Sequence, residues 1–429
     1  MVTERALGDL VRDHAERHAI PGATVGIVRD GMTMIARHGI ADVATGEPIE
    51  ASTWFAAGSL TKTMVATVIV RLAAVGRLSL EDPVPVHVPE VRAASWAGRA
   101  TIRDLLANRS GLPMRAELEF GFDRHTQDDD GALSRLATEV AHVEPLGDFW
   151  SYSNVGWCLL GRAIEVVTGQ TWETAMRLGL FEPAGMRDTT FRSGAGPAPE
   201  ATGHSIEGGR AKPVAARDAR AYGPAGTRVL TTAADLLRFA ELHMTDPLLA
   251  ELRVAHADLA IPGWFDAWCL GQARFDWQGG PVWGWDGMID GQRSVLRYVP
   301  DRRLAVVLLT NASTGRAMSR SLLPELFGSF GIDIPPLDLE STRISAADLN
   351  RFGGNYSWPD WDIRIVPGPA DLTIETPEAR ITASPVAPAT FRVDPPDPDS
   401  PTATFAAFDA ENRPHVFYDS LWGFPRTAT

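Results

Sequence analysis

One stretch of this sequence is apolar on nearly every side of a helix, and it limits the folds open to the chain. Residues 63–75 read Thr-Met-Val-Ala-Thr-Val-Ile-Val-Arg-Leu-Ala-Ala-Val, and Gly76 follows as a typical helix stop. A helix without a polar face needs other elements around it. The chain is therefore expected to build a core that encloses this helix, and 429 residues are enough for roughly two or three domains.

Strand patterns lie at both ends of the first 330 residues. Residues 23–28 and 32–39 flank an Asp30-Gly31 turn signal and predict a β-hairpin, and further strand runs occupy about 281–311. We expect these strands to share one sheet, with a mostly helical segment between them. Helices are expected over residues 6–19, 101–107, 155–168 and 232–244.

The last part of the chain has a different character. We expect residues 1–331 to form the first domain, the proline-containing residues 332–346 a linker, and residues 347–429 a small β domain of short alternating strands. This last part has no motif of its own, so a chain ending near residue 340 is expected to keep its chemistry. The residues expected where the two domains meet are Trp358, Trp361 and Trp422. Residues 114–140, which are polar and irregular, are expected to be an insertion or a lid.

Composition removes several classes of function. The formal net charge of −14 disfavours nucleic acid and anionic membranes as partners. No apolar run reaches the roughly 18 residues of a membrane helix, and the N-terminus does not resemble a signal peptide, so a cytoplasmic location is expected. Cys158 and Cys269 do not make a disulfide framework and are expected to be buried thiols. The ten histidines suggest no metal site, and no cofactor is expected.

Lysine is nearly absent, which makes one lysine conspicuous. Of 40 basic residues only Lys62 and Lys212 are lysine. Lys62 follows Ser59 by three residues at the start of the apolar helix, so the two side chains share a face. A desolvated lysine can lose its proton and activate a neighbouring hydroxyl, and Ser-x-x-Lys is an acyl-transfer motif. The alternative is a chance match in which Ser59 is only a helix N-cap.

A second short motif is Tyr152-Ser153-Asn154, just before the helix expected at 155–168. A phenol held near cations can relay a proton, and an asparagine amide can donate to a substrate carbonyl. Taken alone, this segment reads more simply as a turn with Tyr152 as packing.

Together with their flanks, the two motifs resemble the penicillin-recognising serine hydrolases, in the branch of class C β-lactamase-like esterases, D-peptidases and acyltransferases. The resemblance covers about residues 10–325. Its fragments are Pro21-Gly22-Ala23, residues 58–62, residues 76–83, residues 101–106, residues 110–113, residues 152–154, Gly226, residues 231–236 and the strand ending at Asn311. It implies an α/β (α+β) β-lactamase/transpeptidase-like fold, with a central antiparallel sheet flanked by helices and a helical region. The last part would then be a lipocalin-like barrel.

The resemblance also implies roles. Ser59 would be the acylated nucleophile, Lys62 would take its proton, and Tyr152 would be the general base or proton relay. Asn154 would bind the acyl amide or ester group. The implied substrate is a small ester, amide or peptide; the oligomeric state is left open.

The third motif of this family departs from its usual form. Where the family has Lys-Thr-Gly or His-x-Gly, this chain has Trp285-Asp286-Gly287. Tryptophan offers an apolar wall and one indole N–H, and we expect that it neither pairs with a substrate carboxylate nor biases the tyrosine. The backbone N–H of Met288 can still serve an oxyanion. β-Lactam recognition is therefore not expected, whereas acyl transfer is.

Aromatic residues cluster near this motif and suggest an apolar acyl pocket, with ordinary core packing as the alternative: Trp264, Phe265, Trp268, Phe275, Trp277, Trp283 and Trp285. Three functions are compatible with these features. The first is a serine acyl-hydrolase, an esterase or amidase. The second is an acyltransferase, or a penicillin-binding-protein-type thioesterase or peptide cyclase of natural-product biosynthesis. The third is a catalytically dead binding protein.

Overall fold

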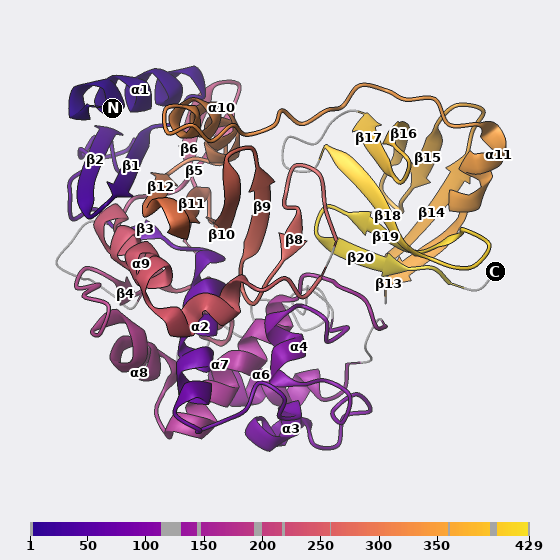
Figure 1. Ribbon diagram of the computed structural model, residues 1–429, viewed down its shortest axis with the longest axis horizontal. Helices are drawn as coiled ribbons and strands as arrows, with labels where there is room; N and C mark the ends of the chain where they lie inside the picture. Colours follow the sequence, from indigo (N-terminus) through magenta and orange to yellow (C-terminus); the bar gives the residue numbers. More distant parts are fainter. Residues whose placement is uncertain are drawn as a thin grey trace.

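The computed structural model describes residues 3–112, 130–143, 147–192, 200–216, 219–257, 259–358, 361–394 and 401–427 (Figure 1). Its main sheet is antiparallel, with strand order β2-β1-β12-β11-β10-β9-β8. The expected N-terminal and late strands do share this sheet. Its strands are β1 (Gly22–Arg29), β2 (Met32–Gly39), β8 (Ala267–Trp268), β9 (Ala273–Trp277), β10 (Gly280–Ile289), β11 (Gln292–Val299) and β12 (Leu304–Thr310).

Helices cover both faces of this sheet. Helix α9 (Ala233–Thr245) packs on the face of Gly26, where an added Cβ would lie 3.0 Å from Leu237. Helix α10 (Gly315–Gly328) packs on the opposite face. Its Gly315 contacts Thr310, which lies three residues along β12 from Val307, the partner of Gly26. Residues three apart on a strand point to opposite faces, so α10 and α9 cover different sides of the sheet. Helix α1 (Glu4–Arg17) lies beside α10.

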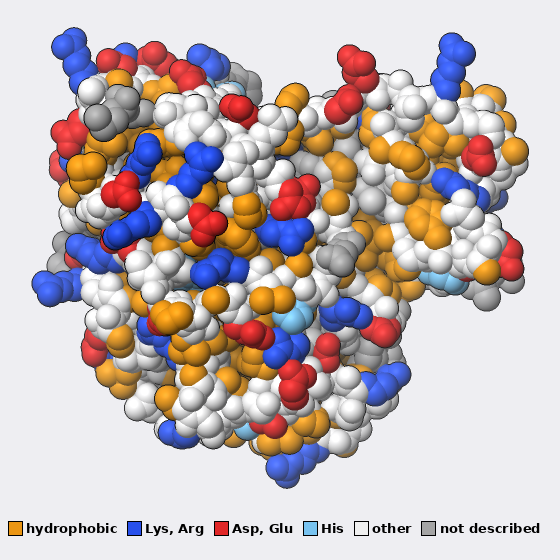
Figure 2. All heavy atoms as spheres, in the orientation of Figure 1, with side chains coloured by type: hydrophobic (Ala, Val, Ile, Leu, Met, Phe, Trp, Pro, Cys, Tyr) orange, Lys and Arg blue, Asp and Glu red, His pale blue; other side chains and the backbone are white. Residues whose placement is uncertain are grey.

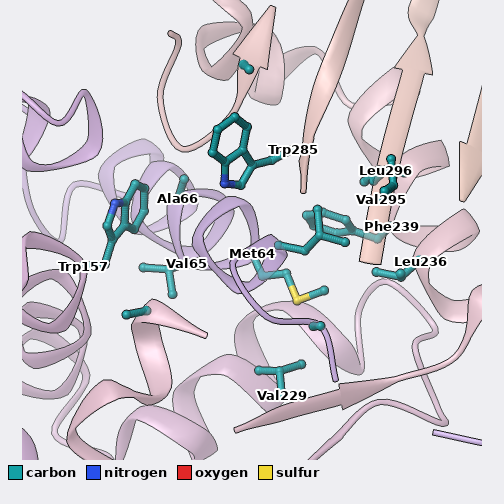
Figure 3. Close-up of a cluster of buried hydrophobic side chains, with 14 of the residues drawn as sticks. Met64, Val65, Ala66, Trp157, Val229, Leu236, Phe239, Trp285, Val295 and Leu296 are labelled. Carbon is teal, nitrogen blue, oxygen red and sulfur yellow. The ribbon is translucent and has the colours of Figure 1, made fainter. Parts of the chain in front are cut away.

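Helix α2 (Leu60–Ala74) lies between the sheet and a helical layer, and every residue from Leu60 to Val70 is buried. Figure 3 shows apolar side chains from several elements around it, among them Trp157, Phe239 and Trp285. The expectation that other elements enclose this helix is confirmed. The helical layer comprises α3 (Val84–His87), η1 (Pro89–Val91), α4 (Ile102–Leu106), α6 (Ala132–Val140), α7 (Asn154–Thr168), α8 (Trp172–Met176), η3 (Arg177–Phe181), η4 (Arg220–Ala225) and η5 (Pro247–Arg253).

Short strands complete the first part of the chain. One small sheet has the order β3-β7-β4 and a two-stranded one joins β5 and β6. Their bounds, with that of η6, are β3 (Phe55–Ala56), β4 (Thr190–Phe191), β5 (His204–Glu207), β6 (Arg210–Pro213), β7 (Val229–Thr231) and η6 (Pro300–Arg302).

The C-terminal strands form a separate antiparallel sheet in sequential order, with its own apolar core. A bridge between Tyr356 and Arg426 brings its two ends together, so the sheet curls into a small barrel. This confirms the small all-β fold expected there. The elements are α11 (Ala346–Leu349), η7 (Asn350–Phe352), β13 (Gly354–Trp358), β14 (Trp361–Pro367), β15 (Leu372–Glu375), β16 (Arg380–Ala387), β17 (Thr390–Asp394), β18 (Thr402–Phe408), β19 (Pro414–Asp419) and β20 (Trp422–Pro425).

The two parts touch through one side of the barrel. Figure 1 shows β18, β19 and β20 on the side that faces the first part, and Figure 2 shows a notch between the two parts at the top of the view. Val416, Tyr418 and Leu421 belong to the main core, and Trp422 packs against both cores. Of the three tryptophans expected at this contact, Trp358 instead belongs to the barrel core, and Trp361 packs against that core.

The region expected to be an insertion or lid is only partly described. Residues 113–129 lie outside the described residues, whereas α6 within 130–143 is a helix with a buried face. Among the described helices, none combines the length and apolarity that a membrane crossing requires.

Candidate active site

Ser59 stands at the N-cap position of α2, but its side chain makes no capping hydrogen bond. Instead, Lys62 Nζ lies 3.1 Å from Ser59 Oγ, as the three-residue spacing predicts. The interpretation of Ser59 as a simple N-cap therefore does not account for its side chain.

Lys62 is completely buried. Its amine also donates a hydrogen bond to the backbone carbonyl of Ala225, and Nζ lies 4.9 Å from the centre of the Tyr152 ring. Three groups from α2, η4 and the segment before α7 thus meet at one amine.

Tyr152 is buried, and the indole N–H of Trp285 donates a hydrogen bond of 3.2 Å to its phenol oxygen. Burial raises the pKa of the Tyr152 phenol well above its ordinary value, while hydrogen bonding with Ser59 and Trp285 acts in the opposite direction. The phenol is therefore neutral at pH 7. The expectation that a tryptophan at position 285 leaves the tyrosine unbiased is wrong, because the indole N–H points at the phenol oxygen.

Strand alternation in β10 decides which side chains reach α2. Gly287 pairs with Ser294, whose hydroxyl donates to the Ala57 carbonyl at 2.6 Å, so Gly287 and Trp285 face α2. A Cβ at Gly287 would lie 2.1 Å from that carbonyl, so only glycine fits.

The backbone of Met288 approaches the nucleophile. A Cβ on Gly58 would lie 2.7 Å from the Met288 nitrogen, which places this N–H beside the residue that precedes Ser59. The backbone nitrogen of Met288 thus lies close to the start of α2, and its role toward an oxyanion stays a prediction.

Asp286 and Asn154 differ in how their side chains are used. Strand alternation turns Asp286 to the opposite face of β10 from Trp285, and its carboxylate forms an ion pair of 2.6 Å with Arg297. A substrate-binding role for Asp286 remains a prediction that this geometry does not favour. Asn154 begins α7 and is half-buried, and within the described parts of the chain its amide makes no hydrogen bond, which leaves it free to contact a substrate.

The aromatic residues near the third motif mostly pack as core. Trp268 lies edge-on to Trp285 with ring centres 4.7 Å apart, and it also contacts Tyr152 at 5.8 Å. Phe265, Trp268, Phe275 and Trp285 are all buried. Phe265, Trp268 and Trp285 pack against one another beside Tyr152. Phe275 instead pairs with Val282 and contacts Arg297 on the opposite face of β10. Both arrangements favour the core-packing alternative over an open acyl pocket.

Sequence reasoning missed two contacts that hold Tyr152. Asn108 accepts hydrogen bonds from the backbone N–H groups on either side, from Ser151 at 2.9 Å and from Ser153 at 3.3 Å. From the barrel, the Leu421 carbonyl accepts the N–H of Tyr152 at 3.2 Å. Asn108 has a φ of 55°, in the left-handed region that asparagine adopts more readily than most residues. Its residue type could therefore have indicated a turn at this position. A backbone carbonyl such as that of Leu421 leaves no mark in a sequence.

Comparison with known proteins points to one family. The family model described as Beta-lactamase matches residues 7–324. The chain is 32% identical over 363 residues to penicillin-binding protein 4 of Amycolatopsis lactamdurans, across 79% of this chain and 93% of the relative. It is 34% identical over 226 residues to the esterase EstB of Burkholderia gladioli, across 49% of this chain and 56% of EstB.

Among solved structures, the crystal structure of SurE matches with a TM-score of 0.83 and 26% identity, across 99% of each chain. SurE with D-Leu matches with a TM-score of 0.82 and 25% identity over the same share of each chain. Both matches include the C-terminal barrel.

Proposed function

Because the chain belongs to the beta-lactamase family of serine hydrolases, we propose that it forms an acyl-enzyme on Ser59 and hydrolyses small esters or amides. The observation that carries this proposal is the 3.1 Å separation of Ser59 Oγ from the amine of the completely buried Lys62. Desolvation favours the neutral form of an amine, which can then take the serine proton. The intact arrangement argues against a catalytically dead binding protein.

In the proposed reaction, Ser59 Oγ attacks the substrate carbonyl carbon while its proton passes to Lys62. The carbonyl oxygen becomes an oxyanion that accepts hydrogen bonds from the N–H groups of Ser59 and Met288. The neutral phenol of Tyr152 relays a proton to the leaving alcohol or amine, and the acyl group stays on Ser59. Water then attacks this ester, the acid is released, and Ser59 regains its proton. Asn154 would hold the acyl chain.

Intact mass spectrometry after incubation with an activated ester tests the nucleophile. We expect a single acyl adduct on the wild type and none on Ser59→Ala, with both proteins equally folded by circular dichroism. An adduct of equal yield on Ser59→Ala would refute the assignment.

We propose that neutral acyl groups are preferred over β-lactams. Trp285 stands where the family usually has a cation, and its indole N–H already donates a hydrogen bond to the Tyr152 oxygen. A penicillin carboxylate would find no cation from this position, and an unpaired buried charge costs several kcal/mol. Turnover of 4-nitrophenyl esters and of benzylpenicillin should differ strongly in favour of the ester, and comparable rates would contradict this preference.

A second candidate is transfer of the acyl group to an amine, as a peptide cyclase or acyltransferase would do. One SurE structure was solved with D-Leu, an amino acid whose amine can accept an acyl group, and it matches this chain over 99% of both chains. Turnover of a peptidyl thioester with and without a D-amino acid acceptor distinguishes the two. Formation of a new amide at the expense of free acid would support transfer, whereas unchanged release of the acid would support hydrolysis.

A further inference from the structure

The C-terminal barrel contacts Tyr152 and the two residues before it through the hairpin of β19 and β20. The Tyr418 hydroxyl donates to the Trp150 carbonyl at 2.7 Å, and the N–H of Gly423 donates to Ser151 Oγ at 3.3 Å. Between these two contacts, the Leu421 carbonyl accepts the N–H of Tyr152 at 3.2 Å. Three consecutive residues, 150 to 152, are thus each bonded to one hairpin.

This hairpin belongs to both cores at once. Along β19, Val416 and Tyr418 are part of the main core, whereas Phe417 between them is part of the barrel core. Leu421, in the turn, also joins the main core, and Phe424 joins the barrel core. The hairpin therefore cannot shift relative to Tyr152 without opening a packed core.

The opposite side of the motif is fixed by the first domain. Asn108 holds the backbone on both sides of Tyr152, and the ring packs against Trp268 and Trp285. The Tyr152 backbone N–H, however, is bonded to the barrel. Backbone placement from both sides sets where the phenol oxygen lies relative to Ser59.

We propose that the β19–β20 hairpin, through Tyr418, Leu421 and Gly423, is a positioning element for Tyr152, so that the barrel sets the proton-relay geometry of the first domain. This inference rests on the proposed function, since it concerns the efficiency of the acyl-enzyme chemistry. None of the three hairpin residues is proposed to touch the substrate.

Two buried tyrosines of the barrel provide a matched test. Tyr418→Phe removes the hydroxyl that binds the Trp150 carbonyl, and Tyr356→Phe removes one that binds the Phe352 carbonyl at 3.0 Å inside the barrel core. Ser151→Ala, which removes the acceptor of the Gly423 N–H, is a second variant at the contact. Each protein is assayed for kcat and KM with 4-nitrophenyl acetate, for its pH–rate profile, and for acylation of Ser59 by intact mass.

We expect Tyr418→Phe and Ser151→Ala to lower kcat by about tenfold with KM little changed, because sub-ångström misplacement of a catalytic group is costly. Their pH–rate profiles should shift relative to the wild type, and Tyr356→Phe should match the wild type in both respects. Equal kcat values and profiles for all variants, with wild-type Ser59 still acylated, would overturn this inference alone. A wild type whose Ser59 is never acylated would overturn the proposed function and this inference with it.

Discussion

Lys62 is a residue whose positive charge alone does not explain its identity, because the chain uses arginine at 38 of its 40 basic positions (40 − 2 lysines). Its amine lies within hydrogen-bonding distance of Ser59, whereas the other lysine, Lys212, is exposed and pairs with Glu207. Arginine keeps its proton at any accessible pH, so it cannot act as a base. We therefore propose that position 62 requires a side chain that can accept a proton.

Replacing Lys62 by arginine tests this requirement directly. We expect Lys62→Arg to lower kcat/KM for an activated ester by about 10²–10⁴-fold, the usual range for loss of general-base catalysis. Lys212→Arg is the matched control and should retain full activity. Steady-state kinetics of both proteins provide the check, and an arginine at position 62 that works within a few-fold of the wild type would reduce Lys62 to an electrostatic role.

We propose that Trp285 influences the reaction through its indole N–H, which donates to the Tyr152 oxygen. Trp285→Phe removes the donor that faces Tyr152, so the phenol pKa should rise further and ester turnover should fall by about tenfold, the equivalent of one hydrogen bond of about 1.4 kcal/mol. Trp268→Phe is the control, because it loses an indole bond to the Leu106 carbonyl instead. The pH dependence of kcat should shift for the first variant only; a shift of equal size in both would assign the effect to packing.

At this scale the sequence predicted side chains better than backbone contacts: of the backbone groups near Ser59 and Tyr152, only the Met288 N–H was named in advance. Ser59 and Lys62 were predicted from their residue types and spacing, whereas Tyr152 and Asn154 were predicted only through the resemblance to a known family. The side-chain direction of Asp286 was not foreseen, because the facing of a strand residue is known only once the register of β10 and β11 is known.

At the scale of elements, α2 is held by polar contacts as well as by apolar packing. His243 on α9 is completely buried, and its ring nitrogens lie 2.9 Å from Thr67 Oγ1 on α2 and 3.3 Å from the Tyr298 hydroxyl on β11. Burial lowers the pKa of His243 to about 3. The neutral imidazole thus links α9, α2 and β11.

The sign of the resulting pH dependence follows from that lowered pKa. An unfolded histidine takes up a proton near pH 6.5, so the stabilisation is complete above about 6.5 and is lost as the pH falls toward about 3. In this window, one such group changes the free energy of unfolding by up to about 1.4 kcal/mol per pH unit. His243→Gln should flatten the slope, and His142→Gln, at an exposed position, should leave it unchanged.

Guanidinium unfolding curves of the three proteins between pH 7 and pH 4 measure these slopes. A slope that is the same in His243→Gln and in the wild type would show that other groups carry the acid sensitivity. The lower stability of the variant at neutral pH is a separate effect and does not enter this comparison.

Several of the longer elements could be predicted, because local sequence signals mark where they begin and end. The pattern of apolar residues on all sides predicted α2. Gly76, with a φ of 71°, follows its C-cap and ends the helix as expected. The Asp30-Gly31 turn gave the hairpin of β1 and β2. Strand β8 was among the elements not foreseen, because two residues are too few to show alternation. Helix α6, which follows a polar, irregular stretch, was also not foreseen, and neither were β9 and α10.

At the scale of the whole molecule, the sequence indicated a C-terminal β barrel but not its contact with the first part. Alternating short strands predict such a fold, because alternation is a property of each strand by itself. The contact depends on the hairpin of β19 and β20, and a carbonyl, an N–H and a hydroxyl make its hydrogen bonds to the tyrosine motif. Three large residues, Trp358, Trp361 and Trp422, were predicted at this contact. Of these three, only Trp422 packs against both cores.

These contacts change what is expected of a chain that ends near residue 340. Such a chain lacks the Leu421 carbonyl that binds Tyr152, and it loses Val416 and Leu421 from the main core, at about 1.5–3 kcal/mol for each fully buried aliphatic side chain. We therefore expect it to melt at a lower temperature and to acylate Ser59 at least about tenfold more slowly than the full chain. Circular dichroism establishes that the shortened chain is folded, and time-resolved intact mass with an activated ester gives the acylation rate. A folded short chain that is acylated as fast as the full chain would show that the first part completes its own active site, and that the barrel serves only larger substrates.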